Sequence, residues 1–219
     1  YNSTMEISSK TKTLREYVDE AVARKVAIGH FNISNLEGFW AVVHAGKAVS
    51  EKAGRPVPVI IGVSEGERDF FGVKEIVAVV RTLREKRGLP IYLNADHTYS
   101  FERVKEAIDA GFDMVIFDGT ELPFEENVKT ARHCVAYAQR TKPFFGERVL
   151  VECELGYIGK SSKVLEAVPD GASISEDSLV KPEDAKRFVK ETGIDLLAPA
   201  IGNIHGMFAE AKDPALDIP

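Results

Sequence analysis

Short apolar segments recur along the chain at regular intervals, and several are rich in β-branched residues. A strand of a parallel sheet that is covered on both faces shows such a continuous apolar run rather than a strict alternation. The pattern therefore predicts six buried strands, at residues 26–34, 56–64, 90–98, 114–120, 149–156 and 195–202.

Stretches with a helical spacing of apolar residues separate these strands. Several end at glycine, which is typical of a helix C-terminus, and a further amphipathic helix is predicted at about residues 10–25. Helices that alternate with strands connect parallel neighbours. The helical stretches between the strands include LEGFWAVVHAGKAVSEKAG, VKEIVAVVRTLREKRG, SFERVKEAIDAG and PFEENVKTARHCVAYAQR.

One long segment breaks the alternation. Residues 157–181 are rich in Ser, Gly and Lys, and they precede a helix that should begin near Pro182. Loops of this length are usually functional or mobile. We therefore predict a mobile loop over about residues 157–181.

Six alternating units are compatible with two architectures, a doubly wound open sheet or a (β/α)8 TIM barrel of which only the first six βα units are present. A whole barrel takes about 250 residues. The final residues, ALDIP, are neither a capped helix nor a charged tail, which favours the incomplete barrel. We expect a single catalytic barrel domain over residues 1–219 that is incomplete at its C-terminus.

Composition and charge narrow the class of protein. A hydrophobic content of 44% with 28% charged residues is typical of a soluble globular domain. The 28 basic and 34 acidic residues give a net charge of −6, which argues against nucleic-acid or membrane partners. Cys134 and Cys153 lack CxxC spacing and the first residues lack a signal-peptide core, so we expect a cytoplasmic protein.

Polar residues occupy the C-terminal ends of the predicted strands, the rim at which βα folds assemble their chemistry. Any one of them alone is consistent with a helix cap or a satisfied core group, and we prefer that interpretation for Ser64 and Asp118 taken singly. Their shared position favours a common site. The set is Asn32, Ser64, Asp96, His97, Asp118, Glu152 and Glu154, followed by His205 after the sixth strand.

His97 and His205 together with a carboxylate are the ligand types that zinc or a similar ion takes. Two histidines alone are a weak signal. Adjacent strand residues face opposite ways, so Asp96 and His97 can serve one site only where the strand has ended. Ser100, a predicted helix N-cap, indicates a strand-to-loop corner there.

Other residues narrow the chemistry by exclusion. His44 and His133 fall within predicted helices and are not taken as ligands, and His30 is interpreted as a core or supporting residue. A Schiff-base mechanism needs a desolvated lysine on an inner strand, and the fifth and sixth predicted strands contain none. The GxGxxG and P-loop phosphate motifs are also absent.

Five motifs in order resemble the class II fructose-bisphosphate and tagatose-bisphosphate aldolase family. The resemblance runs from about Thr13 to the last residue and implies a metal-dependent lyase. Its expected reaction is the reversible cleavage of a ketose 1,6-bisphosphate, with fructose 1,6-bisphosphate favoured, to dihydroxyacetone phosphate and glyceraldehyde 3-phosphate. The motifs are HFNISNLE, LNADHTYS, FDMVIFDGTELPFEENV, VECELGYIG and APAIGNIHG.

The resemblance also implies roles for the rim residues. His97 and His205 would bind the catalytic Zn²⁺ or another divalent metal, and Asp96 would exchange the proton of the C4 hydroxyl. Asp118 and Glu154 match a second or alternative metal position. A monovalent cation is a further candidate cofactor.

Substrate positions follow from the same resemblance. Asn32 and Ser64 match residues that contact the substrate, and the backbone of Gly206 would donate to a phosphate. Glu152 would be a supporting residue. The expected partner is a small sugar phosphate, and relatives commonly form homo-oligomers, either dimers or tetramers.

The chain departs from the family pattern in two places. The third histidine ligand and further phosphate donors belong to two later strands that these 219 residues lack, so we expect a longer complete protein; an intact mass equal to that of 219 residues would refute this. From Gly159 the chain reads GKSSK where the family has an acidic GGxED-like loop. Glu176 or Asp177 could replace that acid, or Lys160 could indicate a different substrate grip.

Two other functions remain open at this stage. A metal-dependent isomerase or hydrolase could use the same ligands, but only an aldolase would release triose phosphates. A non-catalytic sugar-phosphate-binding protein would show no chelator-sensitive cleavage, and it has no evident need for Asp96 beside His97. The sequence leaves open both the choice between fructose and tagatose and the identity of the metal.

Overall fold

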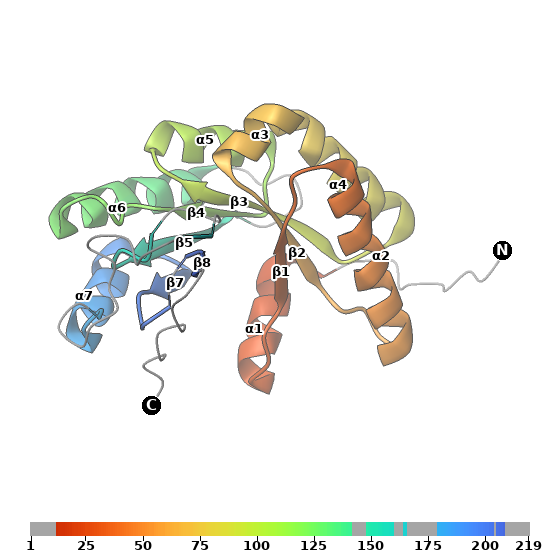
Figure 1. The fold of residues 1–219 in the computed structure, drawn as a ribbon, viewed down its shortest axis with the longest axis horizontal. Helices are drawn as coiled ribbons and strands as arrows, with labels where there is room; N and C mark the ends of the chain where they lie inside the picture. Colours follow the sequence, from red (N-terminus) through yellow and green to blue (C-terminus); the bar gives the residue numbers. More distant parts are fainter. Residues whose placement is uncertain (1–11, 142–147, 160–163, 166–178, 204, 209–219) are drawn as a thin grey trace.

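The computed structural model describes residues 12–141, 148–159, 164–165, 179–203 and 205–208. Six strands form one parallel sheet that curls from its first strand to its last (Figure 1). They are β1 (Gly29–Asn32), β2 (Val59–Val63), β3 (Ile91–Thr98), β4 (Met114–Phe117), β5 (Leu150–Leu155) and β7 (Leu196–Pro199).

The strand order of this sheet follows the order of the chain without reversal, β1-β2-β3-β4-β5-β7. All five pairings are parallel. A doubly wound sheet reverses its order at a switch point, so that alternative is wrong. The chain forms a curled, six-stranded parallel half-barrel.

All of the described helices except α1 lie along the outer side of the curl (Figure 1). Their apolar faces pack on the outer face of the sheet in the main hydrophobic core, which includes Phe39, Val104 and Phe188. The helices in the described residues are α1 (Leu14–Arg24), α2 (Leu36–Ala53), α3 (Glu65–Phe71), α4 (Val73–Arg87), α5 (Phe101–Ala110), α6 (Phe124–Arg140) and α7 (Pro182–Thr192).

Local sequence explains where several helices begin and end. Thr13 and Glu16 form a capping box at the start of α1, and Ser100 caps α5 as predicted. Gly54 and Gly88 follow α2 and α4 in the left-handed conformation that glycine adopts at little cost. The predicted glycine ends of these helices are confirmed.

The inner face of the sheet changes from apolar to polar along the strands. Near the strand N-termini, Leu14 and Tyr17 of α1 cover a second, smaller core. Side chains alternate between faces, so the inner positions that follow along β3, β4 and β5 are Asn94, Asp96, Asp118, Glu152 and Glu154. The strand residues of the smaller core are Ile60, Tyr92, Met114, Ile116 and Leu150.

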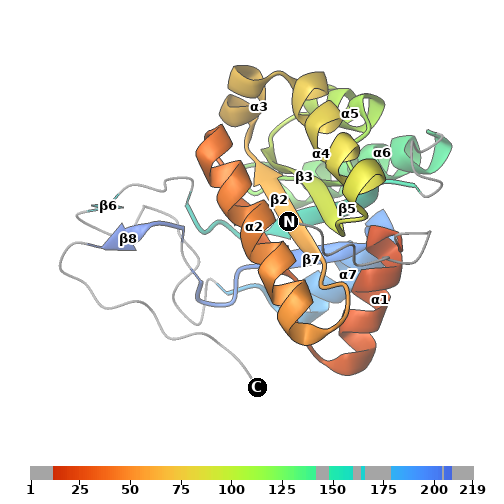
Figure 2. The same ribbon diagram turned by 90° about the vertical axis from the view of Figure 1, so that its right-hand side faces the viewer.

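Some predicted boundaries were wrong. The first strand is confined to Gly29–Asn32, and the short helix α3 was not predicted. Two further strands, β6 (Val164–Leu165) and β8 (Met207–Phe208), pair in a separate parallel sheet (Figure 2). Strand β6 lies within residues 157–181, but most of that segment lies outside the described residues, so the mobile loop stays a prediction.

The described helices and the two cysteines bear on membrane insertion and on disulfide bonding. Within the residues that the structure describes, no helix combines the length and the apolar character that crossing a bilayer requires. Cys134 and Cys153 are both buried and free.

Candidate active site

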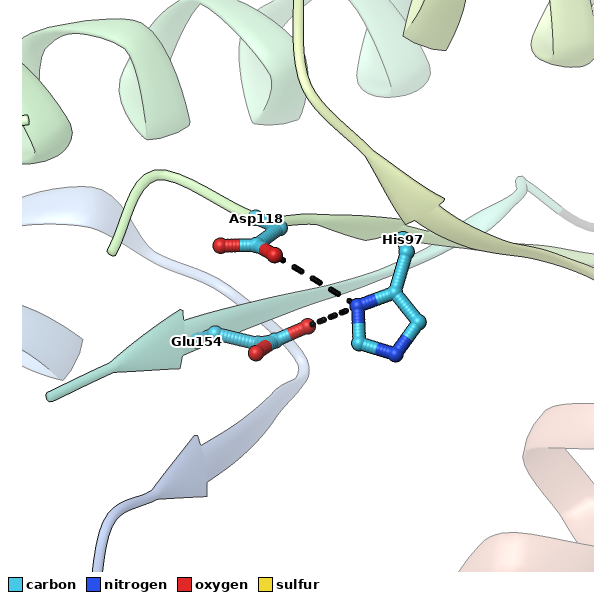
Figure 3. Close-up of side chains that lie close together, drawn as sticks. All are labelled: His97, Asp118 and Glu154. Atoms are coloured by element: carbon cyan, nitrogen blue, oxygen red, sulfur yellow. Dashed lines mark hydrogen bonds and ion pairs between the residues drawn. The ribbon is translucent and has the colours of Figure 1, made fainter. Parts of the chain in front are cut away.

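Three side chains from neighbouring strands meet at the polar end of the inner face. His97 Nδ1 lies 3.2 Å from Glu154 Oε1 and 3.4 Å from Asp118 Oδ2 (Figure 3). One potential ligand atom from each residue falls within 4.8 Å of the others. Imidazole nitrogen and carboxylate oxygen are donors that zinc accepts in proteins, so the chemistry of this group fits a divalent cation.

A β-bulge brings His97 to the inner face. The pairing register between β3 and β4 shifts between Ala95 and Thr98, and His97 has a φ of 43°. This left-handed conformation costs an L-residue about 1–2 kcal/mol, but it allows Asp96 and His97 to face the same side. The predicted strand-to-loop corner is therefore wrong, because β3 continues through Thr98.

The two carboxylates beside His97 raise the pKa of its imidazole. Hydrogen bonds with Asp118 and Glu154 raise the pKa of His97 to about 10. Burial raises the pKa of Asp118, but hydrogen bonds from His97 and Thr120 outweigh it and leave that pKa below its ordinary value. For Glu154 the effect of burial is larger than that of His97, so its pKa is raised.

Glu152 lies one inner position below Glu154 and is the most perturbed carboxyl of the strand. Burial, followed by the negative charges of Glu154 and Asp96, raises its pKa to about 7. It pairs in register with Ile116 of β4 and Leu196 of β7. Glu152 therefore lies between the apolar layer and the polar rim, and its supporting role stays a prediction.

Thr120 orients Asp118. Its backbone N and its Oγ1 donate to Asp118 Oδ1 at 3.1 and 2.7 Å, while Asp118 Oδ2 faces His97. The sequence analysis did not identify Thr120. A hydroxyl residue two positions after an aspartate at a strand end is a turn signal, and it could have indicated this contact.

The Asp96 carboxylate is held by a residue of β1, which lies on the other side of β2. Asn32 Nδ2 of β1 donates to Asp96 Oδ2 of β3 at 2.6 Å, passing over β2. The intervening inner position is Gly62, where a Cβ would clash with Asn32 Oδ1 and with His30 Nε2. The absence of a side chain at Gly62 therefore allows β1 and β3 to interact, and a glycine inside an apolar strand is a sequence signal for such close approach.

His205 lies beside His97 although 108 positions separate them in the chain. The ring centroids are 5.0 Å apart and the ring planes differ by 30°, which is a stacked arrangement. The backbone N of His205 donates to Ile158 O at 2.8 Å, joining this segment to the one that follows β5.

The remaining predicted residues lie around this group. Ser64 caps α3 through a capping box with Glu67, in line with the cap that it was expected to be when taken singly. Gly206 follows His205 with a φ of 122°. His30 is exposed rather than part of the core, and its Nε2 lies 3.2 Å from Asn94 Nδ2.

Other residues that the sequence analysis considered lie away from this group or outside the described residues. His44 and His133 lie in helices α2 and α6, as predicted. No strand in the described ranges contains a lysine. Lys160, Glu176 and Asp177, the alternatives for the loop acid, lie outside the described residues.

Two buried side chains that the sequence analysis missed contact the strand ends from the outer side. Asn127 Nδ2 of α6 donates to Glu154 O at 3.1 Å, and Arg68 of α3 donates to Asp96 O at the same distance. The SEGE pattern at residues 64–67 is a capping-box signature that could have predicted α3 and hence the place of Arg68.

Comparison with known proteins gives a consistent family match. The sequence matches the family model described as fructose-bisphosphate aldolase class-II over residues 12–219. It is 39% identical over 199 residues to the fructose-bisphosphate aldolase of Geobacillus stearothermophilus and 38% identical over 199 residues to that of Staphylococcus aureus strain Mu50. Each alignment covers 90% of this chain but only 63% of the relative, so the chain spans less than two thirds of their length.

A solved structure supports the same arrangement of elements. The YdjI aldolase from Escherichia coli K12 superposes with a TM-score of 0.69 at 26% identity. The superposition covers 93% of this chain and 64% of that chain.

Proposed function

The chain belongs to the class II fructose-bisphosphate aldolase family, and on that premise we propose that the complete protein is a lyase of ketose 1,6-bisphosphates. The favoured substrate is fructose 1,6-bisphosphate, and the products are dihydroxyacetone phosphate and glyceraldehyde 3-phosphate. The observation that carries the proposal is the meeting of His97, Asp118 and Glu154 beside His205, with Asp96 oriented by Asn32.

We propose that the six βα units belong to a closed (β/α)8 barrel. The unreversed strand order and the curl of the sheet support this (Figure 1). The edge strand β1 is exposed along its whole length, as expected of a strand that a further barrel unit would cover. The site lies at the C-terminal ends of the strands, where TIM-barrel enzymes carry their active sites.

We propose that His97 and His205 bind the catalytic Zn²⁺ or another divalent metal, and that Asp118 and Glu154 provide a second position for it. The donor set fits this role. When bound, a divalent ion would supply a Lewis acid that stabilises the negative charge developing as the C3–C4 bond breaks. A monovalent cation stays a candidate second cofactor.

Asp96 is proposed as the base that exchanges the C4 hydroxyl proton. When Asp96 accepts this proton, the C4 oxygen forms the aldehyde carbonyl, the C3–C4 bond breaks, and its electron pair passes to the enediolate of the other product. The hydrogen bond from Asn32 uses Asp96 Oδ2, so it orients the carboxylate while Oδ1 can face the substrate. Such acid–base transfer is typically worth about 10² to 10⁴ in rate.

The proposed substrate contacts are Asn32, Ser64 and the backbone of Gly206. The Ser64 hydroxyl accepts from Glu67 N, so its own proton is available to a substrate oxygen. The positive φ of Gly206 suits a backbone N–H that turns toward a phosphate. We also expect a cytoplasmic homo-oligomer.

A coupled assay tests this proposal on the full-length protein. Triose phosphate release from fructose 1,6-bisphosphate should be detected, should disappear with a chelator and should return with added zinc. Ligand binding without chelator-sensitive cleavage would instead identify a sugar-phosphate-binding protein, and conversion without triose phosphates would identify an isomerase or hydrolase. Either of these two results would overturn the proposed lyase activity.

A further inference from the structure

Arg68 is a fully buried cation on the outer side of the sheet, behind the proposed active site. It belongs to the short helix α3 and has a relative exposure of 0%. Its Nη1 donates to Val63 O at 2.8 Å and to Asp96 O at 3.1 Å, and its Nη2 donates to Thr98 Oγ1 at 3.1 Å. One side chain therefore connects the end of β2 with two residues of β3.

The acceptors of Arg68 are unusual for a buried arginine. All three of its hydrogen bonds within the described residues go to neutral oxygens, and Nε has no partner there. Removing a charge from water without a carboxylate partner is costly. An apolar residue could fill the same space without this desolvation cost. The contacts of the Arg68 guanidinium therefore indicate the role of its charge.

The two contacts on β3 lie on either side of His97. Asp96 O and Thr98 Oγ1 belong to the residues before and after it. The register shift of the β-bulge lies between Ala95 and Thr98, and within this bulge only His97 has a left-handed backbone. Bulged residues lose their regular pairing in the sheet, so this conformation requires support from outside the ladder.

A second side chain of the same helix reinforces this contact. Glu65 Oε1 of α3 accepts from the backbone N of Tyr99 at 2.9 Å. Thr98 Oγ1 also donates to Ala95 O at 3.3 Å, which spans the bulge from within the strand. Helix α3 thus contacts three of the four residues from Asp96 to Tyr99.

We propose that Arg68 is a positioning residue that holds the β3 bulge in the shape in which Asp96 and His97 face the same site. The inference rests on the proposed function for the roles of these two residues. The effect is indirect, because Arg68 contacts the backbone of Asp96 and not its carboxylate. Loss of Arg68 should therefore weaken metal binding and turnover together, whereas loss of the Asp96 carboxylate alone should reduce turnover.

The chain offers a matched control at the other end of the same strand. Arg84 is also buried, and its Nε and Nη2 donate to Ile91 O while its guanidinium pairs with Asp113. Both arginines hold a backbone carbonyl of β3 from a helix on the outer side. Only Arg68 is next to the bulge.

The test compares Arg68→Met, Arg68→Lys and Arg84→Met in the full-length protein. We expect Arg68→Met to lower zinc affinity and turnover each by about 10- to 100-fold, the range found for residues that orient metal ligands. Arg68→Lys should recover part of this loss, because an ammonium reaches one of the two β3 acceptors. Arg84→Met should lower the unfolding temperature while leaving zinc affinity within about twofold.

A readout without metal or substrate separates this inference from the proposed function. Amide hydrogen exchange of the metal-free protein should accelerate in residues 95–99 in Arg68→Met and not in Arg84→Met. Unchanged exchange there, or wild-type zinc affinity in folded Arg68→Met, would overturn the positioning role. If Arg68→Met fails to fold, Thr98→Val removes one acceptor of Arg68 together with the Thr98–Ala95 hydrogen bond, and unchanged exchange in that variant would overturn the positioning role as well. An inactive wild type with accelerated exchange in Arg68→Met would reject the lyase and keep the positioning role.

Discussion

Asn32 and Asp96, which lie on strands that are not neighbours in the sheet, share a hydrogen bond of 2.6 Å. The strand between them contributes Gly62 at this level, and its missing side chain leaves the space through which the amide reaches the carboxylate. The orientation of the proposed base therefore depends on a residue that has no side chain.

Gly62→Ala should reduce turnover without a comparable loss of stability. The new methyl group would displace the flexible ends of Asn32 and His30 rather than any backbone, and the Asp96 carboxylate would lose its partner. Misplacement of a catalytic group by about 1 Å can cost about 10²-fold in rate. We expect kcat to fall by about 10- to 100-fold in a coupled aldolase assay, with an unfolding temperature close to that of the wild type.

Gly66→Ala is the matched control for this substitution. A Cβ at Gly66 in α3 would meet no atom within 4 Å, so this variant should keep wild-type kcat. Equal activity of the two alanine variants would show that the contact over β2 does not orient Asp96.

Asp96→Ala should separate proton transfer from metal binding. Removing a general acid–base group typically costs about 10² to 10⁴ in rate, while His97 and its two carboxylate neighbours remain in place. Turnover should fall within that range, and the zinc content measured by elemental analysis should stay the same. A variant that loses its zinc together with its activity would contradict the division of roles.

Zinc should stabilise the folded protein through His97. A ligand that binds only the folded state adds about 2.7 kcal/mol when present at 100 times its Kd. Thermal unfolding with and without zinc should show this gain in the wild type and a loss of most of it in His97→Ala. His133→Ala on the exposed side of α6 is the control, and an equal zinc-dependent shift in both variants would refute His97 as a ligand.

The Asp195 carboxylate should make the free energy of unfolding depend on pH. Burial raises the pKa of its carboxyl, but hydrogen bonds from Arg148, Val151 N and Arg15 outweigh it and hold the pKa below its usual value. A lowered pKa adds stability that is complete above the unfolded aspartate value of about 3.9 and disappears as the pH falls through the folded value.

Asp195→Asn tests this cluster. At pH 7 the variant should be less stable by about 2 kcal/mol, because hydrogen bonds to a charged group are lost. Urea unfolding at a series of pH values should show the difference from the wild type shrinking below about pH 4. A difference that stays constant down to pH 2 would mean that Asp195 does not titrate with folding.

The sequence by itself determined the alternation of strands and helices and the set of polar residues at the strand ends. Apolar runs, helical spacing and glycine ends act between near neighbours in the chain, so they can be recognised without a structure. Asp96, His97, Asp118 and Glu154 were predicted to share one rim, and the structure brings these four to the same end of the inner face.

Only the tertiary structure decided how these residues meet. The left-handed backbone of His97, the reach of Asn32 over Gly62 and the burial of Arg68 each depend on segments far apart in the sequence. The apolar pattern of the strand does not predict a left-handed backbone at His97. Its cost of about 1–2 kcal/mol is offset by contacts that exist only after the helices have packed on the sheet, and for this reason the predicted corner was wrong.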